Sequence, residues 1–236
     1  MAEREVVIVT GSNRGIGKGI AAKFAREGYD IALFGRDIKS LKDSENELKQ
    51  FGAEIISFSG DVADESFVNT SVHKVEEKFG KIDHLINNAG LGIFNNLADA
   101  KLDDFKKQID TNVYGVFNFS KAVLPGMMER KSGSIINIAS LAGKNAFPGG
   151  SMYSASKHAV LGLTRCLMLE AREFNIRVAA VCPGSVNTEF NFSSSMKPNR
   201  DKVLQVEDVA DSVFAIIQLP VRALISEIDL RPTNPK

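Results

Sequence analysis

VVIVTGSNRGIG, residues 6–17, joins a run of β-branched apolar residues to a turn that contains three glycines. Helical spacing follows in Ile20, Ala21, Phe24 and Ala25. Strand, glycine turn and helix, in that order, form the context of a dinucleotide-binding motif, because glycines allow close backbone approach and a helix N-terminus faces phosphate. The spacing is Gly-x3-Gly-x-Gly rather than Gly-x-Gly-x2-Gly, so this motif alone leaves a purely structural glycine turn open.

Strand-like and helical patterns alternate along the rest of the chain. Strands are expected at residues 6–10, 30–34, 54–59, 84–87, 134–140, 177–182 and 223–230. Helices are expected at residues 16–27, 40–51, 65–79, 103–130, 153–174 and 207–218. Nearly continuous apolar strands indicate a parallel sheet that is covered on both faces. The alternation therefore predicts an α/β protein: a single-domain, Rossmann-type, doubly wound parallel sheet of about seven strands with helices on both faces.

No break in composition divides residues 1–236, so we expect a single dinucleotide-binding and catalytic domain. The least regular stretch is 184–205, which is rich in Ser, Asn and Lys. A segment of this length without periodicity is often a lid or binding loop. We interpret it as an irregular substrate loop.

Composition excludes several classes of function. Lys plus Arg equals Asp plus Glu at 29 each, so no net charge attracts the chain to nucleic acid or anionic lipid. No apolar run approaches the ~20 residues that cross a bilayer, and the start lacks a secretory pattern, so we expect a cytoplasmic protein. Cys166 and Cys182 are interpreted as reduced core residues. The three histidines lack metal-ligand spacing, and no metal site is expected.

Tyr153 and Lys157 are four residues apart in a segment that is expected to be helical, so they share one face of the helix. A nearby ammonium favours a phenolate, and each unit of downward shift in the phenol pKa requires ~1.4 kcal/mol. A tyrosine tuned in this way can exchange a proton with a carbonyl oxygen near neutrality. By itself, the pair could equally lie on a solvated helix face.

Ligands of a doubly wound sheet bind beyond the carboxyl ends of its strands. Five features fall on that edge: Gly11–Gly17, Asp61-Val62, Asn87-Asn88-Ala89-Gly90, Ser140 and Pro183-Gly184. Each one alone is explained by ordinary turn chemistry, in which Asn, Gly, Pro and Ser dominate. Their shared position favours a common site.

The chain resembles the short-chain dehydrogenase/reductase superfamily nearly end to end. The motifs that carry the resemblance occur in the family's order and approximate spacing: Thr10-Gly11-x3-Gly15-x-Gly17, Asn87-Asn88-Ala89-Gly90, Asn112, Ser140, Tyr153-x3-Lys157 and Pro183-Gly184. The resemblance implies a nicotinamide cofactor and a hydride exchanged with a carbonyl or secondary alcohol carbon.

The same resemblance assigns four catalytic residues. Tyr153 would be the general acid in reduction and the general base in oxidation. Lys157 would lower the pKa of Tyr153 and bind the nicotinamide ribose, and Ser140 would orient the substrate oxygen. Asn112 would hold a water that links Lys157 to solvent; the alternative for Asn112 is a helix-interior amide that bonds backbone.

The end of the second expected strand bears on the choice of cofactor. NAD-binding units usually carry an acid about 20 residues beyond the glycines, whereas an arginine accommodates a 2′-phosphate. Gly35 stands where the acid is expected, Arg36 follows it, and Arg14 offers a second guanidinium. Asp37 is a complication, because a shift of one residue would make it the acid. We expect NADP(H).

The cofactor contacts that the resemblance implies form one larger set. They are Gly11, Ser12, Asn13, Arg14, Gly15, Ile16, Gly17, Arg36, Asp61, Val62, Asn87, Ala89, Gly90, Tyr153, Lys157, Pro183, Gly184, Val186 and Thr188. Asp61 could also be a helix cap, since a helical pattern follows it.

The substrate is less well defined by the sequence. A pocket is expected from Phe94, Leu141, Phe147, Phe190 and Phe192. Phenylalanines at these positions could equally pack loops onto the core. The C-terminal end, 225–236, is similar to that of sepiapterin reductase-like enzymes and small hydroxy-acid dehydrogenases. We therefore expect a carbonyl reductase of a small ketone or dicarbonyl.

Two other functions stay open. A 3-oxoacyl-[acyl-carrier-protein] reductase would use Arg130, Lys131 and Arg172 to contact the carrier. A non-catalytic NADP(H)-sensing regulator is the alternative of another class, and the complete set of catalytic residues weighs against it. Surplus apolar positions in the expected helices 103–130 and 153–174 predict a homodimer or homotetramer.

Overall fold

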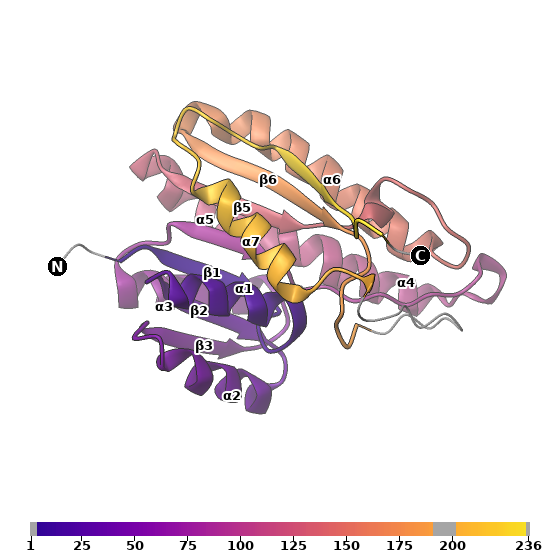
Figure 1. Ribbon diagram of the computed structural model, residues 1–236, viewed down its shortest axis with the longest axis horizontal. Coiled ribbons are helices and arrows are strands. Elements are labelled where there is room, and N and C mark those ends of the chain that lie inside the picture. The colour runs from indigo at the N-terminus through magenta and orange to yellow at the C-terminus, as the bar shows by residue number, and fades with distance from the viewer. Residues whose placement is uncertain (1–3, 191–201, 235–236) are drawn as a thin grey trace.

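A computed structural model describes residues 4–190 and 202–234. Its centre is a parallel sheet of seven strands in the order β3-β2-β1-β4-β5-β6-β7 (Figure 1). The strands are β1 (Val6–Thr10), β2 (Asp30–Gly35), β3 (Ile55–Ser59), β4 (His84–Asn87), β5 (Gly133–Ile138), β6 (Ile176–Pro183) and β7 (Glu227–Leu230). The order reverses direction between β1 and β4, which makes this a doubly wound sheet of the predicted Rossmann type.

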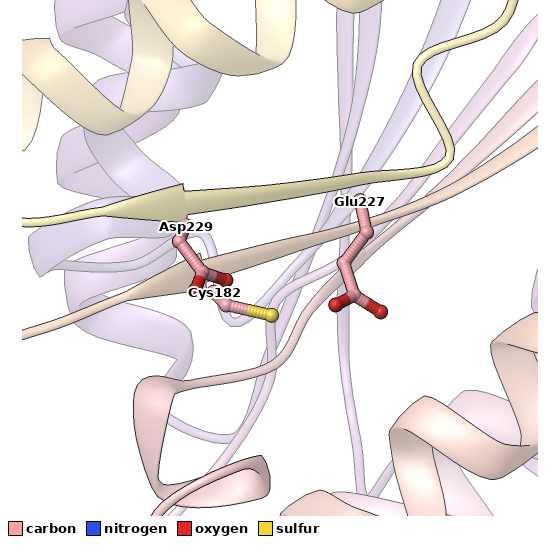
Figure 2. A group of neighbouring side chains, drawn as sticks. All are labelled: Cys182, Glu227 and Asp229. Atoms are coloured by element: carbon pink, nitrogen blue, oxygen red, sulfur yellow. The ribbon is translucent and has the colours of Figure 1, made fainter.

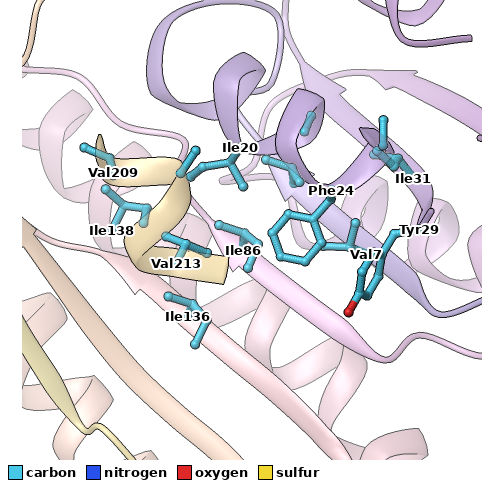
Figure 3. Packing of buried hydrophobic residues seen from close by; sticks show 14 of the residues in the cluster. Val7, Ile20, Phe24, Tyr29, Ile31, Ile86, Ile136, Ile138, Val209 and Val213 are labelled. Carbon is cyan, nitrogen blue, oxygen red and sulfur yellow. The ribbon is translucent and has the colours of Figure 1, made fainter. Parts of the chain in front are cut away.

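Helices cover both faces of the sheet. One layer consists of α1 (Gly15–Arg26), α2 (Ile38–Lys49) and α7 (Val206–Ile217), and the other contains α3 (Glu65–Phe79), α5 (Gly115–Arg130) and α6 (Ser151–Ala171). Figure 3 shows the first layer, where Phe24 of α1 and Val213 of α7 pack against Ile86 and Ile136 of the central strands. The five inner strands β2, β1, β4, β5 and β6 are almost fully buried, as their continuous apolar runs predict, while the edge strands β3 and β7 are partly exposed.

Two expected elements have different boundaries. The single helix expected over 103–130 is α4 (Leu102–Ile109), a π-helical turn η2 (Asp110–Tyr114) and α5. The expected last strand, 223–230, is confined to β7, because only that part pairs with β6. Among the described residues, no helix is long and apolar enough to cross a membrane.

The expected fifth strand also ends early. β5 stops at Ile138, and Ser140 instead precedes the short 3-10 turn η3 (Leu141–Gly143). Ser140 Oγ accepts a 3.1 Å hydrogen bond from Ala142 N, which starts this turn. The hydroxyl is therefore held just beyond the strand, at the carboxyl edge of the sheet.

Candidate active site

A cleft of about 1690 Å³ runs along the carboxyl ends of the strands. Its walls contain most of the residues predicted from the sequence: Gly11, Asn13, Arg14, Gly15, Ile16, Arg36, Asp61, Val62, Ala89, Gly90, Phe94, Ser140, Leu141, Phe147, Tyr153, Lys157, Pro183, Gly184, Val186, Thr188 and Phe190. The motifs that are distant in the sequence thus meet at one edge, because all seven strands are parallel. Phe192 lies outside the described residues.

Three predicted cofactor contacts, Ser12, Gly17 and Asn87, lie behind the wall and support it. Ser12 is fully buried and its Oγ accepts a 3.0 Å hydrogen bond from Phe34 N. A Cβ on Gly17 would lie 2.3 Å from Gly11 O, so Gly17 allows the turn to pack on α1. Asn87 donates hydrogen bonds to side chains of neighbouring elements. Ser12, Gly17 and Asn87 thus have packing roles within the wall, and their contact with the cofactor stays a prediction.

The glycine turn and the start of α1 form a cradle for an anion. Gly11 and Gly15 have φ values of +64° and +54°, a region that favours glycine. The first turn of α1 has no acidic residue and its N-cap, Arg14, makes no side-chain cap. Among the described residues no side chain caps the start of α1, and Gly15 and Ile16 line the cleft, an arrangement that suits a phosphate.

Asn88 holds this turn and was missed by the sequence analysis. Its Nδ2 donates to Thr10 O at 2.9 Å and to Gly11 O at 3.2 Å, and the residue lines the cleft. A Cβ on Gly11 would lie 2.8 Å from Ala89 Cα, so only glycine lets the two loops meet. The sequence could have identified Asn88 as a site residue, since it belongs to the motif Asn87-Asn88-Ala89-Gly90.

At the far end of the cradle, Asp37 is engaged in a helix cap. Its carboxylate accepts hydrogen bonds of 2.7 Å from Ser40 N and 2.6 Å from Ser40 Oγ, which lower the pKa of Asp37. Gly35 has no side chain to offer, while Arg36 lines the cleft with Arg14. Arg14 Nη1 lies 3.8 Å from Glu189 Oε2, and both side chains are exposed. This end of the cleft is accordingly fitted for a phosphate rather than for two ribose hydroxyls.

Tyr153 and Lys157 lie in the first two turns of α6 and both line the cleft. Lys157 Nζ donates a 2.9 Å hydrogen bond to Ile138 O and lies 5.8 Å from the centre of the Tyr153 ring. A Cβ on Gly90 would lie 3.6 Å from the same Nζ, so the backbone of the β4 loop passes beside the ammonium. The pair therefore lies inside the site, and the solvated-face interpretation is wrong.

The expected direction of the Tyr153 pKa is wrong in this structure. Burial raises the pKa of Tyr153 to about 12, and a hydrogen bond with the Ser140 side chain lowers it only in part. Burial also lowers the pKa of Lys157 to about 8. Because the ammonium bonds Ile138 O rather than the phenol, desolvation outweighs the attraction that the sequence suggested.

Asn112 is fully buried, and its side-chain amide accepts one hydrogen bond and donates two. Oδ1 accepts from Leu91 N at 2.8 Å, and Nδ2 donates to Leu91 O and to Ser156 Oγ at 2.9 Å each. The side chain thus ties the loop after β4 to α6, which matches the alternative interpretation from the sequence. A role of Asn112 in a water relay stays a prediction, and the two amide hydrogens do not take part in it.

Aromatic side chains surround the Tyr153 ring. The centre of the Phe94 ring lies 5.3 Å from that of Tyr153, and the centre of Phe190 lies 6.1 Å from it. Phe147 packs against Phe94 at 5.9 Å. The described phenylalanines of the expected pocket therefore enclose the phenol in an apolar environment, which explains its raised pKa.

Two further polar residues of the wall were not predicted. Asn145 follows η3, and its Nδ2 donates to Leu141 O at 3.2 Å. Arg231 follows β7 directly and lines the cleft beside Pro183 and Gly184. The rule that ligands bind at strand carboxyl ends, applied to the last strand, could have identified Arg231.

Comparison with known proteins gives a consistent result. The family model described as short chain dehydrogenase matches residues 5–199. An uncharacterized oxidoreductase of Staphylococcus aureus strain USA300 is 32% identical over 228 residues, which cover 97% of each chain. Glycine betaine reductase of Emericella nidulans is 32% identical over 238 residues, and the chain spans only 19% of that protein.

Solved structures are similar over nearly the whole chain. An alcohol dehydrogenase from the archaeon Thermococcus sibiricus, complexed with 5-hydroxy-NADP, has a TM-score of 0.90 and 32% identity, covering 98% of this chain and 97% of that one. A xylitol dehydrogenase with bound NAD+ has a TM-score of 0.88 and 29% identity, covering 98% of this chain and 100% of that one. Both cofactor types thus occur among similar structures.

Proposed function

The chain belongs to the short-chain dehydrogenase family and is an oxidoreductase, and on this premise we propose that it reduces a small ketone or dicarbonyl with NADPH. The observation that carries the proposal is the position of Tyr153 and Lys157 on the wall of the cleft that contains the glycine cradle. The proton donor Tyr153 and the binding site for the dinucleotide would then lie in the same cleft, so that both can act on one substrate carbonyl.

The residues of the cleft fit a nicotinamide dinucleotide. The uncapped N–H groups at the start of α1 would bind the pyrophosphate, and Asp61 and Val62 would lie beside the adenine. Arg14 and Arg36 would bind a 2′-phosphate, which supports NADP(H) over NAD(H) for this chain. When bound, the nicotinamide supplies the hydride.

Tyr153 would donate the proton to the substrate oxygen. Burial raises its pKa to about 12, so the phenol is protonated near neutral pH, which is the form a general acid needs. Ser140 interacts with the phenol and would hold the substrate oxygen next to it. The surrounding phenylalanines would limit the access of water to the reacting atoms.

Lys157 would keep a positive charge below the phenol during proton transfer. Its pKa of about 8 leaves the ammonium mostly charged near neutral pH, although it is buried. The charge would stabilise negative charge that develops on Tyr153 as the proton leaves. The Ile138 carbonyl holds the ammonium in place.

The structure weakens one argument for the alternative function, a 3-oxoacyl-[acyl-carrier-protein] reductase, because it shows another partner for Arg130. Arg130 Nη2 bonds Ile82 O and so belongs to the end of α5, which reduces its availability for a carrier. No observation among the described residues of the site favours the other alternative, a non-catalytic NADP(H)-sensing regulator. We therefore keep carbonyl reduction as the proposed activity.

We also propose a homodimer or homotetramer through α5 and α6. Large apolar side chains are exposed there: Phe117 is 47% exposed and Leu169 is 56% exposed. Exposed apolar groups on long helices indicate a contact with another protein surface. A second copy of this chain is the expected partner.

The experiment that tests the proposed activity is NADPH consumption over a panel of ketones, dicarbonyls and 3-oxoacyl thioesters. Tyr153→Phe should lower kcat by at least about 100-fold and leave NADPH binding within about 3-fold. Tyr114→Phe is the matched control, because Tyr114 is 53% exposed. Equal turnover by Tyr153→Phe and the wild type would refute the mechanism.

A further inference from the structure

We propose that Arg231 binds a carboxylate of the substrate, so that the enzyme prefers oxo acids, or the matching hydroxy acids, to neutral ketones. The inference rests on the proposed carbonyl reduction and adds the substrate class to it. Arg231 lines the same cleft as Tyr153 and Ser140, and an arginine can bind a carboxylate through two parallel hydrogen bonds.

The sheet register brings Arg231 to the catalytic edge. Cys182 pairs with Asp229 and Pro183 pairs with Leu230, so Arg231 follows at the level of Gly184. Gly184 N donates a 2.9 Å hydrogen bond to Leu230 O, which fixes this end of β7. Arg231 therefore lies just beyond the carboxyl end of β7, at the edge of the sheet where the cleft lies.

The side chain of Arg231 lies on the same face of the sheet as α6. Cys182 packs in a cluster with Val160 and Leu161 of α6, and its register partner Asp229 points to the same side (Figure 2). Alternation along an extended chain returns Arg231 to the face of Asp229. The 3.8 Å contact between Arg231 Nη2 and Asp229 Oδ2 agrees with this direction. α6 is the helix that carries Tyr153 and Lys157.

The distance from Ser140 to Arg231 suits a short substrate. Ser140 follows β5 and Arg231 follows β7, two strands away in the sheet. Neighbouring strands are about 4.8 Å apart, so the two backbones are separated by roughly 10 Å. The Arg231 side chain stands on the α6 face of the sheet in its contact with Asp229, and an arginine side chain is long enough to turn from there toward Ser140. With the guanidinium turned toward Ser140, a carboxylate one to three carbons from the carbonyl would reach Arg231 while the carbonyl oxygen meets Ser140 and Tyr153.

Among the described residues, the ion pairs along β7 join three cations to two carboxylates. Lys144 Nζ forms ion pairs with both Glu227 and Asp229, and Arg165 Nη2 lies 3.1 Å from Glu227 Oε2. With Arg231, three cations face two carboxylates, and the difference is one positive charge. An anionic ligand in the cleft would balance it.

Of these three cations, Arg231 has the weakest contact with a carboxylate. Its contact with Asp229, at 3.8 Å, is longer than a hydrogen bond, and among the described residues its guanidinium has no hydrogen bond. The side chain is 57% exposed. Its donors are therefore available to a substrate, whereas those of Lys144 are occupied.

The neighbouring thiol does not change this balance. Burial raises the pKa of Cys182 to about 11, so the thiol is neutral near neutral pH. Cys182, Glu227 and Asp229 place ligand atoms within 4.8 Å of one another, a grouping that could hold a metal ion (Figure 2). Lys144 already contacts both carboxylates, so the group is better explained as an ion-pair network that supports Arg231.

An opposing charge defines the alternative outcome. Asp99, on the turn η1 (Leu97–Asp99), also lines the cleft and would disfavour an anion near it. If Asp99 rather than Arg231 governs selection, neutral or cationic ketones would be preferred.

The test compares a 4-oxo acid with its methyl ester as substrates, using NADPH and steady-state kinetics. The two compounds carry the same ketone and differ in the charge at the far end. Wild-type enzyme should have the higher kcat/KM for the acid. Arg231→Gln should lower kcat/KM for the acid by about 10- to 100-fold, chiefly through KM, and leave the ester within about 2-fold.

Two variants serve as controls. Arg231→Lys keeps the charge without the planar fork and should fall between the wild type and Arg231→Gln. Arg222→Gln removes an exposed arginine outside the cleft and should match the wild type for both compounds.

The outcomes distinguish the inference from the activity on which it rests. Equal use of acid and ester by the wild type, a preference for the ester, or an equal loss for both compounds in Arg231→Gln overturns the inference and leaves carbonyl reduction standing. If no member of the wider carbonyl panel is reduced, the proposed function fails, and the inference fails with it.

Discussion

Lys157 Nζ donates a 2.9 Å hydrogen bond to the carbonyl oxygen of Ile138, the last residue of β5. The bond holds a buried ammonium at the end of a central strand, beside Tyr153. Burial lowers the pKa of Lys157 to about 8, so the folded protein disfavours the charge that the proposed mechanism uses. The charge on Lys157 that the proposed mechanism needs therefore lowers the stability of the fold, and the size of this effect can be measured.

Lys157→Met should abolish turnover and stabilise the fold near neutral pH. The desolvation cost disappears, and the loss of the bond to Ile138 O offsets part of the gain, so about 1–2 kcal/mol should remain. Between about pH 8 and 10.5 the unfolded wild type binds more protons than the folded one, and wild-type stability therefore rises with pH there. The advantage of the variant should shrink across that window.

Urea denaturation near pH 7 and near pH 10.5 measures this difference. Lys106→Met is the matched control, because Lys106 is 62% exposed and should show no such pH dependence. A Lys157→Met protein that is less stable than the wild type near pH 7 would contradict the prediction.

The pH profile of reduction should be set by Lys157 and not by Tyr153. As pH rises through about 8, Lys157 loses its charge and kcat/KM should decline. Tyr153, with a pKa of about 12, stays protonated in this range. Initial rates at low substrate from about pH 6 to 10 measure the profile. An alkaline limb confined to about pH 10 or above would show that Lys157 keeps its charge.

Cofactor preference should depend on Arg14 and Arg36. Replacing either arginine by Gln should lower kcat/KM for NADPH by about 10- to 100-fold, because a charge-assisted bond to phosphate is lost. The value for NADH should change less than about 3-fold. Arg172→Gln, which is exposed and outside the cleft, serves as control. A wild-type preference for NADH would overturn the assignment.

Glu45 should stabilise the protein above acidic pH. Burial alone would raise its pKa, but hydrogen bonds with Lys49, Ser57 and Lys42 outweigh this and lower the pKa to about 2. The folded pKa lies below the unfolded one, so the stabilisation is present above about pH 4.5 and is lost as pH falls through about 2.

Glu45→Gln should therefore cost about 2 kcal/mol near neutral pH and progressively less as pH falls toward 2. Thermal unfolding followed by circular dichroism measures the difference. Glu47→Gln is the control, since Glu47 is 51% exposed in its pair with Lys18. A constant difference between wild type and Glu45→Gln at all pH values would exclude the titration of Glu45 as its cause.

Association should depend on the exposed apolar residues of α5 and α6. Phe117→Glu and Leu169→Glu place a charge in the proposed interface and should convert an oligomer into monomer. Leu102→Glu on α4, which is 65% exposed, should leave the assembly intact if α5 and α6 form the contact. Light scattering reports the mass. A monomeric wild type would remove the proposal.

Much of the fold and of the site could be predicted because the signals are local. Residues 6–17 contain a buried strand, a glycine turn and a helix start within one stretch, and parallel strands must bring their carboxyl ends to one edge. The helix spacing also placed Tyr153 and Lys157 on one face correctly. The π-helical turn at 110–114 was missed, because a single wide turn inside a long helical pattern has no residue signature of its own.

The sequence by itself thus determined the sheet, the motif order and the composition of the cleft, since these follow from short-range patterns and from strand direction. Only the tertiary structure decided the protonation and the partners: Tyr153 is made less acidic by the phenylalanines packed around it, Asn112 is used by Leu91 and Ser156, and Arg231 is brought to the site by the register of β7. Desolvation and hydrogen-bond partners depend on segments far apart in the chain, so no local pattern encodes them.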